Sequence, residues 1–221
     1  MFSRIPRLIS IVTTAMCATF LISGCTAPSQ IYAADKKDGV YFTVPYSWKK
    51  ITSLALNARE AQSTTPGASD RLSQVKWQEA YSPSADIGPA DVFNLTTPKS
   101  PIVYVRIRSL SADEANAVSY NALRNIIVPV TTWLTSTSPS TPKFQLLDDG
   151  ENVQKIARGV HTIFAFTGSD GISQTMNQTS LVSDDRSTIY VLLVRSSTLY
   201  YNAHKSELEK IANSFTVRGN S

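Results

Sequence analysis

The sequence is poor in cysteine. Among 221 residues there are only two, Cys17 and Cys25. Both precede the part of the chain that carries strand and helix patterns. The folded part therefore has no thiol, which excludes a disulfide, a cysteine nucleophile and a cysteine metal ligand there. Such a domain must be stabilised by its hydrophobic core alone.

Histidine is equally scarce, with His161 and His204 as the only two examples. Neither belongs to an H-x-H or H-E-x-x-H pattern, so the sequence gives no support for a metal centre. We expect His161 to be a partly exposed residue at a strand start; a base or metal ligand is the alternative. His204 falls on the apolar side of the last predicted helix, where a packed and hydrogen-bonded imidazole is expected.

The chain also has little net charge. Its formal charge is +4, and two of the positive charges, Arg4 and Arg7, lie in residues 1–24, which contain no acidic residue. Removing that segment leaves +2. A nucleic-acid-binding protein would present a basic stripe with interleaved aromatic residues. The sequence has no such stripe, and we exclude that class.

What the N-terminus does contain is the pattern of a bacterial lipoprotein signal. Arg4 and Arg7 precede an apolar segment over residues 8–21. That segment is shorter than the ~20 residues of a membrane-spanning helix. It is followed by Ile22-Ser23-Gly24-Cys25, where small residues precede a thiol as in a lipobox. We predict cleavage before Cys25 and lipidation of its sulfur; a secretory signal cut elsewhere and an uncleaved anchor are the alternatives.

A lipidated Cys25 would hold the protein on the extracytoplasmic face of the cell membrane. Two acyl chains give a stable anchor, whereas a single chain binds membranes only marginally. We therefore divide the chain into a signal peptide (1–24), a flexible tether (25–37) and one globular domain (38–221). The tether is expected because its residues are small and polar and have no periodicity.

The domain is predicted to consist mainly of strands. Val40, Phe42 and Val44 alternate with polar residues up to Pro45, which is typical of a strand with one buried face. Further strand patterns occupy residues 72–81, 102–110, 143–147, 160–167, 173–182 and 188–195. The last is the most continuously apolar and is predicted to be a central strand. Turns are expected at 148–150, 169–171 and 183–185, so neighbouring strands should pair antiparallel.

Two main helices are predicted. Ser111 and Glu114 have the spacing of a capping box, and Pro129 should kink or stop the helix that follows near Val128. Apolar positions of that helix recur every fourth residue: Val118, Ala122, Ile126 and Val130. The second helix covers residues 198–214, with one side formed by Tyr201, His204, Leu208, Ile211 and Phe215. A mainly antiparallel sheet with these helices makes an α+β fold, an α/β/α sandwich.

Three segments resemble the PsbP-like group of proteins, which includes the LpqN-type lipoproteins of Gram-positive bacteria. They are residues 39–48, 190–194 and 210–217, and the resemblance spans residues 38–217. It implies an antiparallel sheet flanked by helices, and a role as an accessory or binding module at the membrane surface rather than as an enzyme. It carries over no functional residue, because the matching positions are core and turn residues. Loops 57–70 and 82–91 match no pattern of the group, and specificity is expected there.

Two S-x-x-K matches, Ser47 with Lys50 and Ser73 with Lys76, have the spacing found in penicillin-recognising enzymes. The chain has no K-T-G or S-D-N partner motif. Ser73 and Lys76 also fall in a strand pattern, where their side chains would point to opposite faces. We expect both matches to be coincidental.

Two acidic clusters and a set of aromatic residues complete the candidates. Asp148, Asp149 and Glu151, and separately Asp184 and Asp185, could bind a hard cation, but solvated turns are the simpler interpretation. The aromatic residues could line a groove, but we expect most of them to fill the core. They are Trp48, Trp77, Trp133, Tyr41, Tyr46 and Tyr81.

These observations predict a lipid-anchored, non-catalytic binding or accessory module for an envelope protein or a lipid. No catalytic, metal or cofactor residue is assigned, and Cys25 is the one predicted site of chemistry. The alternative is an envelope hydrolase with an unrecognised serine or carboxylate, which would need a nucleophile and a base in one cleft. A solute-binding lipoprotein is disfavoured because its two lobes need a longer chain.

Overall fold

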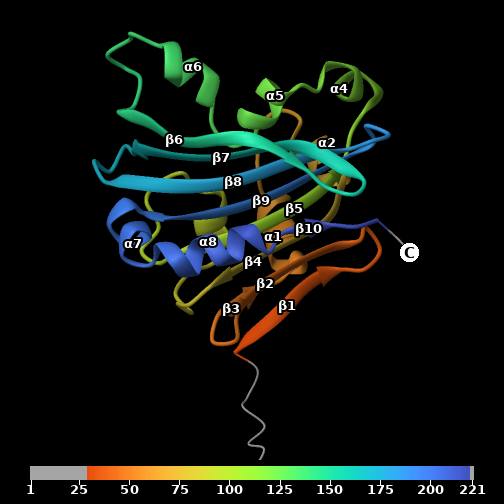
Figure 1. The fold of residues 1–221 in the computed structure, drawn as a ribbon, viewed down its shortest axis with the longest axis horizontal. Helices are drawn as coiled ribbons and strands as arrows, with labels where there is room; N and C mark the ends of the chain where they lie inside the picture. The colour runs from red at the N-terminus through yellow and green to blue at the C-terminus, as the bar shows by residue number, and fades with distance from the viewer. Residues whose placement is uncertain (1–28, 220–221) are drawn as a thin grey trace, which may run out of the picture.

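The computed structural model describes residues 29–219, which form two antiparallel sheets and several short helices (Figure 1). The large sheet has seven strands in the spatial order β3 (Lys49–Ile51), β4 (Val75–Ser82), β5 (Ile102–Ser109), β9 (Thr188–Ser197), β8 (Ser173–Ser183), β7 (Ala157–Thr167) and β6 (Phe144–Val153). The small sheet has three, β1 (Gln30–Asp35), β2 (Val40–Pro45) and β10 (Thr216–Val217). The predicted α+β class with antiparallel pairing is confirmed.

Short helices fill the connections between the strands. They are α1 (Ser53–Glu60), α2 (Ala68–Ser73), α3 (Pro89–Phe93), α4 (Ala112–Ala117), α5 (Tyr120–Arg124), α6 (Val130–Thr135), α7 (Thr198–Ala203) and α8 (Lys205–Asn213). Figure 1 shows α7 and α8 crossing one face of the large sheet, with α4, α5 and α6 gathered beyond β6 and β7. No helix within residues 29–219 has the length and apolar character needed to cross a membrane.

The strand β9 separates two cores. Tyr190, Leu192 and Val194 face the larger core, which they share with the small sheet, α7 and α8. Ile189, Val191 and Leu193 face the opposite side of the sheet, because side chains alternate along a strand. Three smaller clusters lie on that side, under α1, α3 and the α5–α6 region. β9 lies between β5 and β8, as predicted for a central strand.

The predicted tether is wrong over residues 30–35, which form strand β1. This strand pairs with β2 along its whole length, from Gln30 opposite Pro45 to Asp35 opposite Val40. Ala33 is buried and Ile31 packs against the larger core, so alternate side chains of the segment contribute to folding. The globular unit therefore begins earlier than residue 38.

The first predicted helix is three short helices. The capping box is present at α4: the Glu114 amide donates to Ser111 Oγ (3.2 Å) and the Ser111 amide to Glu114 Oε2 (2.9 Å). The chain is extended again at Val118, well before the expected kink near Val128. Ser119 then caps α5 by accepting from the Ala122 amide, and a serine cap favours a new start over a continuous helix.

The second predicted helix is divided into α7 and α8 at His204. Tyr201, Leu208, Ile211 and Phe215 are buried as expected. His204 is exposed, and its ring stacks on Tyr200 with centroids 4.1 Å apart, so the predicted packed and hydrogen-bonded imidazole is wrong. The break rotates His204 off the apolar side that an uninterrupted helix would have given it.

Two strand boundaries also differ from the prediction. Residues 72–73 belong to α2, and β4 begins at Val75. The predicted turn over 148–150 lies inside β6, where a bulge between Leu146 and Asp148 shifts the register against β7. A polar run is tolerated there because β6 is an edge strand with one side free of neighbours. The turns predicted at 169–171 and 183–185 are present.

Candidate functional site

The candidate site is a groove on the face of the large sheet opposite α7 and α8. Its volume is about 380 Å³, within the usual range for small-molecule sites. Side chains from β5 and β9 form the floor: Tyr104, Arg106, Arg108, Ile189, Val191, Leu193 and Arg195. The walls are Glu60 and Arg71, then Val92, Phe93 and Leu95, and finally Ile126 and Ile127. We call this hollow the sheet groove.

The register of β5 and β9 places these side chains together. Tyr104 lies opposite Leu193 and Arg106 opposite Val191, and all four point to the same face. The two loops that the sequence marked for specificity both reach this region. The predicted loop 57–70 is partly helical, since its ends belong to α1 and α2, and Glu60 at the end of α1 lines the groove. The predicted loop 82–91 runs into α3, whose residues after Asp91 form a wall.

Two of the groove's four arginines are neutralised by glutamates. Arg106 makes a two-point contact with Glu60, at 3.0 Å from Nη1 to Oε2 and 2.9 Å from Nη2 to Oε1. Arg108 Nη2 lies 2.9 Å from Glu114 Oε1, and the same glutamate caps α4. These pairs fix the floor and leave little net charge at that end of the groove.

Arg195 differs from the other three arginines because it is buried and has no acidic partner. Its side chain is only 1% exposed. Nη2 donates to the backbone carbonyl of Asp91, while Nε and Nη1 are buried without a hydrogen-bond partner. No carboxylate within residues 29–219 lies at ion-pair distance from it. Burial lowers the pKa of Arg195 to about 10, against the opposing field of Asp91, so the guanidinium stays charged at neutral pH.

Tyr104 is expected to make the stability of the fold depend on pH. Burial raises its pKa to about 12, although Arg106 opposes the shift. The pKa in the folded state lies above the unfolded value, so this group stabilises the fold below pH 10 and loses that contribution as the pH rises to about 12. We expect roughly 3 kcal/mol of stability to disappear across that window.

The measurement is the free energy of unfolding at a series of pH values for the wild type and for Tyr104→Phe. The wild type should fall more steeply between pH 10 and pH 12. Tyr32→Phe, at a position that is 80% exposed, is the control and should follow the wild type. Parallel curves for wild type and Tyr104→Phe would contradict the assignment.

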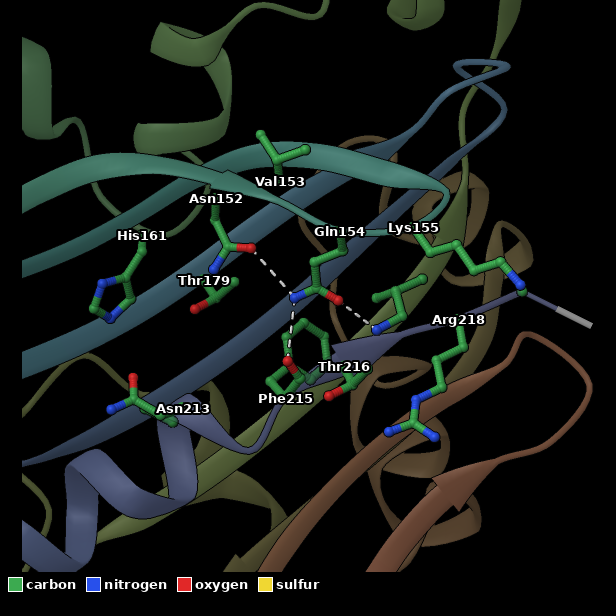
Figure 2. A pocket seen from close by; sticks show the side chains of 13 residues that line it. Asn152, Val153, Gln154, Lys155, His161, Thr179, Asn213, Phe215, Thr216 and Arg218 are labelled. Carbon is green, nitrogen blue, oxygen red and sulfur yellow. Dashed lines mark hydrogen bonds between the residues drawn. The ribbon is translucent and has the colours of Figure 1, made fainter.

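A second hollow, of about 720 Å³, lies between the β6–β7 hairpin and the C-terminal segment after α8 (Figure 2). Gln154 stands at its centre: Nε2 donates to the Phe215 carbonyl (3.1 Å) and to Asn152 Oδ1 (3.3 Å), and Oε1 accepts from the Val217 amide (2.5 Å). Figure 2 shows the bond to Phe215 joining the hairpin to the C-terminal segment, and the bond to Asn152 within the hairpin. We call this hollow the amide cleft; the side-chain amide of Gln154 at its centre is engaged in holding the C-terminal strand.

The predicted histidine and serine–lysine candidates form no catalytic arrangement. His161 is half-buried in β7, and its Nε2 lies 2.8 Å from Asn177 Oδ1, which agrees with the structural interpretation. Ser73 Oγ donates to the Asp70 carbonyl (2.7 Å), whereas Lys76 contacts Asp38 (3.1 Å) and Thr188 (3.0 Å). Lys50 pairs with Glu79 rather than with Ser47.

The acidic residues are engaged with protein partners. Asp149 pairs with Arg124 (2.8 Å), Asp184 with Arg158 (3.3 Å), and Glu151 accepts from the Tyr120 hydroxyl. In the described range no group of three or more His, Cys, Asp or Glu could hold a metal ion.

Most of the aromatic residues pack as expected. Trp48 and Tyr81 are buried, and Trp77 and Trp133 pack against core clusters, whereas Tyr46 is 61% exposed. None of the six aromatic candidates lines the sheet groove. Tyr104, Arg106 and Arg195 are not predicted from the sequence; the available signal was the presence of arginines in two otherwise largely apolar strands. The predicted lipidation site, Cys25, and the predicted signal peptide lie outside the described residues.

Comparison with known proteins gives similarity in fold only. No protein-family model and no curated protein sequence matches the chain. Among solved structures, it is similar to the cyanobacterial PsbP protein CyanoP from Synechocystis, with a TM-score of 0.49 and 13% identity over 88% of this chain and 96% of that one. For LpqN of Mycobacterium tuberculosis, involved in cell envelope biogenesis, the TM-score is 0.46 with 13% identity over 85% and 89%. For the Saccharomyces cerevisiae Ran-binding protein Mog1p it is 0.45 with 11% identity over 86% and 96%.

The PsbP-like and LpqN-type resemblance stated from the sequence thus recurs among these structures as a resemblance of fold. At identities of 13% and below, it transfers no ligand, partner or activity to this chain.

Proposed function

We propose that this chain is a non-catalytic binding module, held on the extracytoplasmic face of the cell membrane by a diacylglycerol on Cys25. Its sheet groove would bind a lipid or another ligand with an apolar part. The observation that carries this proposal is the apolar part of the groove floor, formed by Ile189, Val191 and Leu193 on the central strand. A hollow of this kind suits a lipid or small ligand better than a flat protein surface.

The residues around the groove are suited to binding rather than to covalent chemistry. Its described lining includes no serine, cysteine or histidine, and its one carboxylate, Glu60, is held by Arg106. Tyr104 is neutral at physiological pH and donates its hydroxyl to Gln78 Oε1 (2.6 Å). The hydrolase alternative would require a nucleophile and a base together, and this groove offers neither.

The lipid anchor is supported by the sequence of the N-terminal segment alone. Arg4 and Arg7, the apolar run and the small residues before Cys25 stand in the order that a lipoprotein signal requires. An anchored module would keep its groove close to membrane lipids, which fits an apolar ligand.

The test uses the full chain in membranes and a neutral photoreactive probe, decanol carrying a diazirine. Cross-linked peptides are identified by mass spectrometry. Labelling should concentrate on the groove walls, residues 92–95 and 126–127. Leu95→Asp places a charge on a wall position that is 45% exposed and should reduce this labelling several-fold, because burying an unpaired carboxylate beside an apolar ligand is costly.

Leu199→Asp is the matched control, since Leu199 in α7 is 84% exposed and lies away from the groove. It should leave labelling of the wall peptides unchanged. Labelling spread over the whole surface, or equal loss in both variants, would refute a ligand site in the groove.

A further inference from the structure

We infer that the ligand of the sheet groove is a monocarboxylate on an apolar chain, and that its carboxylate binds Arg195. This inference rests on the proposed function, because it specifies the charge of the ligand that the groove would take. It follows from the position of Arg195, from its unused donors and from the pairing of Arg106 and Arg108 with glutamates.

Arg195 has hydrogen-bonding capacity that the protein leaves unused. A guanidinium carries five N–H donors, and here only Nη2 has a partner, the Asp91 carbonyl. A buried charge without a counter-charge is expensive, and such groups are normally paired. An acceptor with one negative charge at this end of the groove would satisfy the guanidinium and restore neutrality.

The part of the floor that β9 supplies continues from Arg195 as a row of apolar side chains. Arg195 stands opposite Ile102, and Leu193, Val191 and Ile189 follow on the same face of β9. Leu193 to Ile189 covers four residue steps, which is about 13 Å of strand. Arg195 therefore lies buried at one end of the groove, with an elongated apolar surface beside it. This arrangement is complementary to an aliphatic carboxylate.

The surrounding charges favour a single negative charge on the ligand. Arg106 and Arg108 are already paired with Glu60 and Glu114, and the fourth arginine, Arg71, is exposed at the rim. The nearby carboxylate of Asp91 would repel a second negative charge. Within residues 29–219 Arg71 also has no carboxylate partner, but water solvates it at the rim. A doubly charged phosphate would therefore be poorly compensated, whereas a carboxylate matches the one buried guanidinium that lacks a counter-charge.

Gln174 offers the competing explanation. Its Oε1 is also buried without a partner, and its Nε2 donates to the carbonyl of Leu95 in the groove wall (2.6 Å). On β8, Met176 lies opposite Arg195. Gln174 precedes Met176 by two residues and therefore lies on the same face of the sheet. A water molecule between the two side chains could satisfy both without any ligand.

The experiment compares photoreactive decanoate with photoreactive decanol, at equal concentration, on the full chain in membranes. The carboxylate should label the groove walls about tenfold more than the alcohol, because hydrogen bonds to a charged group are the stronger ones. Arg195→Gln should reduce labelling by decanoate to the level of decanol without reducing labelling by decanol. Arg195→Lys, which keeps the charge with a different geometry, should retain part of the preference.

Arg158→Gln, which removes an exposed arginine outside the groove, should behave as the wild type. Thermal melts of each variant show whether it is folded. Equal labelling by decanoate and decanol, unchanged in Arg195→Gln, would overturn the inference in favour of a bridging water and leave the proposed function intact. Absence of groove labelling by either probe would refute the proposed function itself.

Discussion

Replacing Cys25 with alanine is expected to release the protein almost completely from the membrane fraction. The physical reason is that the proposed anchor is the pair of acyl chains on this sulfur, and each buried methylene contributes about 0.8 kcal/mol to membrane binding. The measurement combines fractionation of cells with metabolic incorporation of an alkyne-bearing palmitate. Both the membrane association and the label should be lost.

Cys17→Ala is the natural control, because Cys17 is the chain's other cysteine and lies within the segment that the signal hypothesis removes. It should keep both the label and the membrane association. If Cys25→Ala stayed labelled and membrane-bound, the lipoprotein hypothesis would be wrong, and the uncleaved anchor would become the better explanation.

Replacing Arg195 with methionine is expected to stabilise the fold. The guanidinium is 1% exposed and lacks a counter-charge, so the folded protein bears its desolvation cost. Exchanging buried charged groups for apolar side chains of similar volume has stabilised proteins by about 1–4 kcal/mol. In a domain of this size each kcal/mol raises Tm by about 2–4 °C. Thermal unfolding of the ligand-free protein is the measurement.

Arg106→Met is the matched comparison and should have the opposite sign. Arg106 is also a groove arginine, but it pairs with Glu60, and the two side chains are 16% and 13% exposed. Removing it would leave a largely buried carboxylate unpaired, which typically costs about 3–5 kcal/mol. If Arg195→Met destabilised the protein as strongly, Arg195 would be a structural residue with no need of a ligand carboxylate.

The strands were predictable where one face of a strand is clearly apolar. β2, β5, β8 and β9 have alternating or continuous apolar patterns, and the structure places them close to the expected bounds. β1 was missed because Tyr32 and Ala34 are exposed on a short edge strand, so only Ala33 and Ile31 report its buried side. Its pairing with β2 is a tertiary effect that local composition does not encode.

The positions of the helical regions were predictable from the sequence, but the interruptions within each of them were not. A four-residue apolar repeat indicates which residues face the core, and Leu123, Val128 and Val130 are indeed buried in this region. The repeat does not tell whether one helix or several supply those residues. Serine at position 119 starts a new helix because its side chain bonds the amide of Ala122, and such a local bond competes with helix continuation.

Of the sheet groove, only the segments that border it could be predicted from the sequence. The loops marked for specificity do adjoin it, at Glu60 and next to Asp91. Its floor could not be recognised, because a charged residue in a strand is ordinarily assigned to the solvent face. Both faces of β5 and β9 are covered in this fold, and that is why Arg106 and Arg195 are largely buried.

The most direct test of a ligand site in the sheet groove is hydrogen exchange on the full chain in membranes, with and without decanoate. A ligand in the sheet groove should slow exchange in segments 60–71, 88–95 and 124–127, since these contain the wall residues that would contact the bound chain. The amide cleft, residues 152–155 and 213–219, should be unchanged. Protection of the cleft with unchanged walls, or no protection in either region, would contradict a binding module whose site is the groove.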